Sequence, residues 1–204
     1  MMINRPHWSY SSVNQYLRCP LQYYFQRIEK LPQPSIGVGL VLGSSVHSAL
    51  EFYHRRLKDQ LPVEAAEVRQ AFLESWQARE AKGKIVFRKG ATREEGIAQG
   101  IGLVEIYLQE PPPEGIVDIE RQMLFPLRNS RGEILETPMV AIVDLLTRDE
   151  LGLKIIELKT SGRSYGNMEV DVSLQPTSYV NAVWESYEEE ARVEYAVLVK
   201  TKKP

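Results

Sequence analysis

The stretch Val140–Thr160, VAIVDLLTRDELGLKIIELKT, predicts two neighbouring β-strands joined by a polar turn at residues 148–152. Asp144 and Glu157 stand inside these apolar strands, where a carboxylate is unfavourable unless another group compensates its charge. Side chains alternate along a strand, so Glu157 and Lys159 share one face of the sheet. The pattern predicts a site that binds a divalent cation and has an ammonium group beside it.

The spacing of Glu157 and Lys159 does not by itself establish such a site. Glu80-Ala81-Lys82 has the same Glu-x-Lys pattern, but it lies in a polar helical run and is interpreted as a solvated helix face. The second copy differs in its context, because it lies in an apolar strand that follows another strand with its own Asp144. A buried cluster of Asp144, Glu157 and Lys159 without a metal remains the structural alternative, although such clusters are poor stabilisers.

Asp144 followed by Glu157-Leu158-Lys159 resembles the core motif of the PD-(D/E)XK nuclease superfamily. Further motifs resemble its RecB-like branch, which includes the CRISPR-associated exonucleases, and they extend the resemblance over almost the whole chain. In order, they are Ser9-Tyr10-Ser11 with Cys19-Pro20-Leu21-Gln22-Tyr23, Gly43-Ser44-Ser45-Val46-His47, Gln175-Pro176-Thr177-Ser178-Tyr179, and Tyr195-Ala196-Val197-Leu198. Ala141 departs from the branch, which often has Gly at this position.

The resemblance implies an α/β fold with a restriction-endonuclease-like αβββαβ core, in which helices flank a mixed central sheet. Strand patterns from residue 116 onward and helical patterns before it agree with this expectation. We expect one nuclease domain over residues 1–204, with a mainly helical part at 1–110 and a sheet core at 114–204. Within the helical part, Gly43 is expected to open a helix over residues 44–60.

The resemblance also assigns roles to the motif residues. Asp144, Glu157 and His47 are the expected metal ligands, and the Leu158 carbonyl is a further candidate. Oxygen ligands favour Mg²⁺ or Mn²⁺, and the imidazole shifts the preference toward Mn²⁺. Lys159 is expected to orient the attacking water or to stabilise negative charge at phosphorus.

Three other residues are expected near this centre. Gln175 and Tyr179 lie four apart and share one helix face. The resemblance implies that they hold either the substrate strand or the lysine. The alternative for Tyr179 is simple packing against the sheet. Glu120 is expected behind the metal ligands, in support of them.

An aromatic stripe near the N-terminus is interpreted as core rather than as a platform for stacking bases. Its residues lie on helical segments expected to end near Arg18 and to resume over residues 21–29. They are Tyr16, Tyr23, Tyr24 and Phe25. Cys19, between the segments, is interpreted as a small buried hydrophobe.

Composition excludes several classes of protein. The 204 residues are 43% hydrophobic and 25% charged, as in ordinary globular domains, and no apolar run is long enough to span a membrane. The N-terminal residues lack the pattern of a secretory signal, and the single Cys19 fits a reducing cytoplasm. One cysteine also cannot form an iron–sulfur cluster from this chain alone. The net charge of −2 provides no overall basic field for nucleic acid.

The resemblance implies a divalent-metal-dependent deoxyribonuclease, an exonuclease of DNA repair, recombination or CRISPR-type defence. Its expected partners are DNA, as single strands or ends, and a helicase or another protein of a nuclease complex. The alternative is a RecB-like module that has lost catalysis and holds DNA in a helicase–nuclease assembly. Every position of the catalytic motif carries a competent residue, which favours the nuclease.

Overall fold

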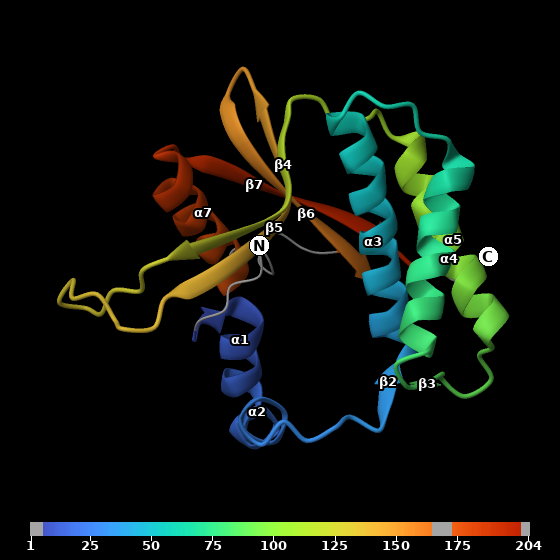
Figure 1. Ribbon diagram of the computed structural model, residues 1–204, viewed down its shortest axis with the longest axis horizontal. Coiled ribbons are helices and arrows are strands. Elements are labelled where there is room, and N and C mark those ends of the chain that lie inside the picture. The colour runs from blue at the N-terminus through green and yellow to red at the C-terminus, as the bar shows by residue number, and fades with distance from the viewer. Residues whose placement is uncertain (1–5, 165–172, 201–204) are drawn as a thin grey trace.

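The computed structural model of the protein describes residues 6–164 and 173–200. Its centre is a five-stranded mixed sheet (Figure 1). The strands are β1 (Trp8–Ser9), β4 (Ile116–Phe125), β5 (Met139–Asp149), β6 (Gly152–Ser161) and β7 (Ala191–Val199). β5 pairs antiparallel with both β4 and β6, and the short β1 is parallel to it. β7 is parallel to β6, and a parallel neighbour requires a crossover, which helix α7 (Leu174–Tyr187) provides.

Helices cover both faces of this sheet (Figure 1). On one face pack α3 (Val38–Lys58), α4 (Ala65–Glu80) and α5 (Arg93–Gln109), and their apolar side chains share a core with Leu158 and Leu198 of the sheet. On the other face α7 buries Tyr179, Ala182 and Val183 against β4, β5 and β6. The expected mixed α/β fold, with a central mixed sheet, flanking helices and a helical N-terminal region, is therefore confirmed.

Two local expectations about the helices were wrong. Helix α3 begins at Val38 rather than near residue 44, so Gly43 lies inside the helix. Residues 21–29 do not form one α-helix: α1 (Tyr10–Arg18) is followed by the short α2 (Pro20–Tyr23) and by the π-helix η1 (Tyr24–Ile28). Cys19 is half-buried rather than buried, and its sulfur accepts the backbone N–H of Gln22 and so caps α2.

A small parallel sheet also forms outside the central one, from β2 (Ser35–Gly37) and β3 (Lys84–Val86). It joins the segment before α3 to the connection between α4 and α5. Within the described part of the chain, no helix combines the length and the hydrophobicity needed to cross a bilayer.

Candidate active site

The site lies where the ladder between β5 and β6 ends. The two strands pair from Asp149 and Gly152 as far as Leu145 and Ile156. Beyond this pair a side chain takes the place of a main-chain acceptor: the Leu158 N–H donates to Asp144 Oδ2 at 2.8 Å. This hydrogen bond compensates part of the cost of a carboxylate that is only 9% exposed.

Helix α3 brings His47 to Asp144. The imidazole Nδ1 lies 3.6 Å from Asp144 Oδ1. One turn earlier, Gly43 faces β6, and a Cβ atom built at Gly43 would lie 3.0 Å from Thr160 Oγ1. The absence of a side chain at Gly43 therefore lets α3 approach the sheet closely enough for His47 to reach the aspartate. The Gly-x-x-x-His spacing has this packing role in addition to supplying the histidine.

Glu120 of β4 completes a group of three possible metal ligands. The ligand atoms of His47, Glu120 and Asp144 all lie within 4.8 Å of one another. The register places Glu120 opposite Asp144, because Ile119 and Arg121 pair with Leu145 and Val143. Glu120 has a φ of +47°, a left-handed conformation that costs a residue with a side chain roughly 1–3 kcal/mol. Sequence reasoning expected Glu120 behind the ligands, whereas the structure places it beside the candidate ligands His47 and Asp144.

The electrostatics of this group suit a cation. Burial and the charges of Asp144 and Glu51 raise the pKa of Glu120 to about 7. Burial lowers the pKa of His47, but the hydrogen bond and charge of Asp144, with the charges of Glu157 and Glu120, outweigh it and leave the pKa raised. Carboxylates crowded in this way repel each other, and a bound cation would relieve the repulsion. Carboxylate oxygens with one imidazole nitrogen form a donor set that fits Mg²⁺ or Mn²⁺.

Glu157 and Lys159 form a second group against helix α7. Lys159 Nζ donates to Glu157 Oε1 at 2.5 Å and to Gln175 Oε1 at 3.0 Å. Glu157 also accepts the hydroxyl of Tyr179 at 2.7 Å and the amide of Gln175 at 2.9 Å. Burial and the charge of Asp144 raise the pKa of this carboxyl, which is 2% exposed. The ring of Tyr195 lies 5.9 Å from Lys159 Nζ and adds a cation–π contact.

The structure thus divides the expected site residues into two adjacent groups. His47 and Asp144 meet on the α3 side with Glu120, while Glu157, Lys159, Gln175 and Tyr179 are hydrogen-bonded on the α7 side. The expected alternation in β6 is present, because Leu158 packs into the α3-side core while its neighbours face α7. Glu157 is held by α7 and is absent from the group of three donors around His47.

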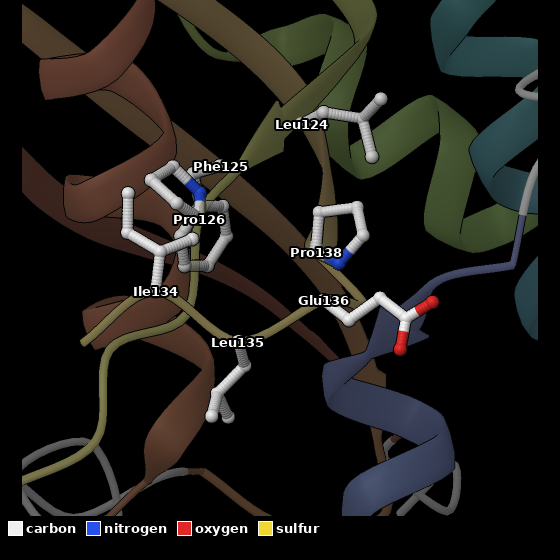
Figure 2. A pocket seen from close by; sticks show the side chains of 7 residues that line it. All are labelled: Leu124, Phe125, Pro126, Ile134, Leu135, Glu136 and Pro138. Atoms are coloured by element: carbon white, nitrogen blue, oxygen red, sulfur yellow. The ribbon is translucent and has the colours of Figure 1, made fainter.

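A separate hollow lies at the base of the loop between β4 and β5 (Figure 2). It is lined by Leu124, Phe125, Pro126, Ile134, Leu135, Glu136 and Pro138. None of the residues of the two groups at the candidate site borders it, and its lining offers a single charged group, Glu136. The chemistry of the described residues is therefore gathered at the Asp144–Glu157 break in the sheet and not in this hollow.

The family model of the PD-(D/E)XK nuclease superfamily matches residues 7–204. The chain belongs to this superfamily. The search of curated proteins gave no match. Among solved structures, one described as "Crystal structure of SSO0001" is similar, with 16% sequence identity, coverage of 91% of this chain and 71% of that chain, and a TM-score of 0.31. A similarity this remote adds nothing further about the site.

Proposed function

We propose that this chain is a RecB-like, metal-dependent deoxyribonuclease that hydrolyses phosphodiester bonds as an exonuclease, in DNA repair, recombination or CRISPR-type defence. One observation carries the proposal. The ammonium of Lys159 is held by Glu157 and Gln175, beside a group of His47, Glu120 and Asp144 that can bind a divalent cation. Superfamily membership supports the reaction class. The close packing of Gly43 on Thr160, four residues before His47, and the hydrogen bond between Gln175 and Tyr179 support the RecB-like branch.

The metal would be Mg²⁺ or Mn²⁺. We assign His47, Asp144 and Glu120 as ligands because they lie together. The family motif adds Glu157 and the Leu158 carbonyl, and Glu157 would have to exchange a hydrogen bond to the α7 side for the metal. The N–H and C=O of a strand residue point to the same neighbouring strand, and Leu158 N–H already meets Asp144, which supports the role of its carbonyl. When bound, the cation lowers the pKa of a coordinated water and neutralises charge on the phosphate.

Lys159 supplies the remaining positive charge. Its partners Glu157 and Gln175 hold the ammonium in the group on the α7 side, which adjoins the group around Asp144. We expect it there to orient the attacking water or to stabilise charge that develops at phosphorus. Gln175 is in turn bonded to Tyr179, so α7 holds both the lysine and the carboxylate in place. Such fixed groups lower the barrier because they need little reorganisation during the reaction.

The test is a cleavage assay on end-labelled single- and double-stranded DNA with Mg²⁺, Mn²⁺ or EDTA. We expect cleavage with either metal and none in EDTA, and circular single-stranded DNA should resist an exonuclease. Lys154→Met is a matched control for Lys159→Met, because Lys154 lies on the same strand and pairs with Glu194 instead. Wild-type protein that binds DNA but cuts neither DNA nor RNA with any divalent metal would establish the alternative, a binding module without catalysis.

A further inference from the structure

The segment from residue 16 to residue 31, here called the N-terminal arm, exposes an unusual number of large apolar side chains. Seven of them are at least 43% exposed: Tyr16, Leu17, Leu21, Tyr24, Phe25, Ile28 and Leu31. Within the arm, α2 packs mainly against η1 and α1, and it is α1 that contacts β1, β5 and α7. Figure 1 shows α1 and α2 apart from the α3–α5 layer. The expectation that the aromatic stripe belongs to the core was therefore wrong.

Polar contacts, rather than burial of these side chains, fix the shape of the arm. Gln15 of α1, just before the arm, is buried, and its amide donates to Gln26 of η1 while its oxygen accepts the Nε–H of Arg27 at 3.0 Å. The π-helical turn places Tyr24 and Glu29 together, and the tyrosine hydroxyl donates to the carboxylate. Clustered apolar groups on an internally ordered segment are typical of a binding surface.

The chemistry of the arm identifies the class of ligand. Its rings form two edge-to-face pairs, Tyr16 with Tyr23 at 5.5 Å and Tyr24 with Phe25 at 5.7 Å between centroids. The arm carries three cationic residues and one acidic residue, although the whole chain has a net charge of −2. The cationic residues are Arg18, Arg27 and Lys30. Exposed rings interspersed with cations are the combination that proteins use to bind single strands, by stacking bases and attracting the backbone.

The arm also lies within reach of the candidate active site. Its helix α1 follows β1, in which Ser9 pairs with Val140 of β5. Asp144 lies four residues further along β5, roughly 13 Å away at about 3.3 Å per residue. Tyr16 lies six residues into the α1 segment, roughly 9 Å further at 1.5 Å per residue. A single strand of about ten nucleotides can therefore touch both places, whereas one phosphodiester unit cannot.

We propose that the N-terminal arm binds single-stranded nucleic acid, whose bases stack on Tyr24, Phe25 and the Tyr16–Tyr23 pair while its phosphates lie near the arm's cations. The proposal rests on the proposed nuclease function and names the path of its substrate. It makes the arm a determinant of affinity for long strands and leaves the hydrolysis itself to the residues around Asp144 and Lys159.

The experiment compares the double variant Tyr24→Ala/Phe25→Ala with wild type on two ligands. The first is a labelled 20-nucleotide single strand, whose Kd is measured by fluorescence anisotropy in EDTA, so that binding is read without cleavage. The second is a small phosphodiester with a chromogenic leaving group, assayed with Mn²⁺. We expect the Kd to rise about tenfold or more, on the scale of lost base stacking, while hydrolysis of the small diester is unchanged.

Two further variants control for loss of an exposed aromatic side chain. Trp184→Ala removes a ring that is 51% exposed on α7, outside the arm, and should leave the Kd unchanged. The exchange Tyr24→Phe/Phe25→Tyr keeps both rings and should retain wild-type affinity for the strand. Arg18→Gln should reduce the dependence of the Kd on salt by about one counterion.

An unchanged Kd in the alanine variant would overturn the proposal. Equal weakening by Trp184→Ala would overturn it as well, because the effect would not belong to the arm. The outcome for the proposed nuclease is separate. Wild-type protein that hydrolyses neither the diester nor DNA would refute the nuclease, while the Kd in EDTA would still decide the role of the arm.

Discussion

Removing the Tyr179 hydroxyl should destabilise the protein and disturb the active site together. Tyr179 is 5% exposed, and its hydroxyl donates to Glu157 Oε2 at 2.7 Å while it accepts the Gln175 amide at 2.6 Å. A hydrogen bond to a charged group contributes about 1.5–3 kcal/mol. Because Glu157 is itself buried, its freed oxygen finds no ready replacement. We therefore expect Tyr179→Phe to lower the free energy of unfolding by about 1.5–3 kcal/mol.

Tyr179→Ala should cost more, about 3–5 kcal/mol, because the ring packed in the α7-side core is lost as well. Urea unfolding of the metal-free protein measures both variants. Tyr16→Phe is the control, since a ring that is 53% exposed should change the free energy of unfolding by less than about 0.5 kcal/mol. An unfolding free energy of Tyr179→Phe equal to that of wild type would refute the assigned hydrogen bond to Glu157.

Kinetics then separate two roles for Tyr179. If the hydroxyl positions Glu157, Tyr179→Phe should lower kcat for DNA and for a small phosphodiester alike, because both need the same carboxylate. If the tyrosine also contacts the substrate strand, KM for DNA should rise while KM for the small diester does not. Unchanged cleavage of both substrates would remove Tyr179 from the functional residues.

Three further predictions concern single side chains. Lys159→Met should abolish cleavage but leave DNA and metal binding nearly intact, as measured by kcat and by calorimetry, because the ammonium acts on the transition state. The pKa of Glu120 is raised from 4.5 to about 7, so its ionised carboxylate destabilises the folded state fully above pH 7 and not at all below pH 4.5. Glu120→Gln should therefore raise the free energy of unfolding of the metal-free protein at pH 8 by about 1–2 kcal/mol, a value reduced for partial exposure. The same variant should gain less stability from added Mg²⁺ or Mn²⁺, and equal gains would exclude Glu120 as a ligand. Burial lowers the pKa of His54 from 6.5 to about 4, so the folded protein holds this imidazole neutral and loses stability as the pH falls from 6.5 toward 4. Between pH 7.5 and 4.5 the free energy of unfolding of wild type should therefore fall by about 2–3 kcal/mol more than that of His54→Gln, as measured by urea unfolding.

The sheet core was predictable because its signals are local. The turn at residues 148–152 carries its own signature, and Gly152 adopts the positive φ of +96° that a tight hairpin needs. The alternation of Glu157, Leu158 and Lys159 follows from strand geometry and needs no knowledge of distant residues. The same locality made the crossover through α7 predictable, since a parallel neighbour for β6 requires one.

The place of Glu120 could not be read in the same way. Its arrival among the ligands depends on the register between β4 and β5 and on a left-handed residue inside a strand. The sequence signal was weak, because Glu120 shares its strand with Asp118 and Arg121, whereas Asp144 is the single charged residue of an apolar run. Strict alternation would place Val143 and Leu146, which are three residues apart, on opposite faces of the sheet. In the structure they lie in one core cluster, and the sequence does not predict this irregularity.

The aromatic stripe of the N-terminal arm shows a different limit. Helical spacing of apolar residues indicates a face that can be buried, but it does not name the surface that covers it. In the described part of the chain, α2 and η1 pack mainly against each other and against α1, so most of the stripe remains exposed. The expectation of a core failed because periodicity carries information about one element and burial depends on two.

Fold and chemistry meet where regular pairing of the sheet stops. A continuous β5–β6 ladder would use the Leu158 N–H for main-chain pairing, whereas here the Asp144 carboxylate accepts it. On the neighbouring strand β4, Glu120 has a left-handed backbone conformation, and its carboxylate lies with Asp144 and His47. Both departures cost stability in the metal-free chain, and both bring negative charge to one point between α3 and the sheet. A cation at that point would offset the cost, which gives a physical reason for an irregular sheet centre in a metal-dependent nuclease.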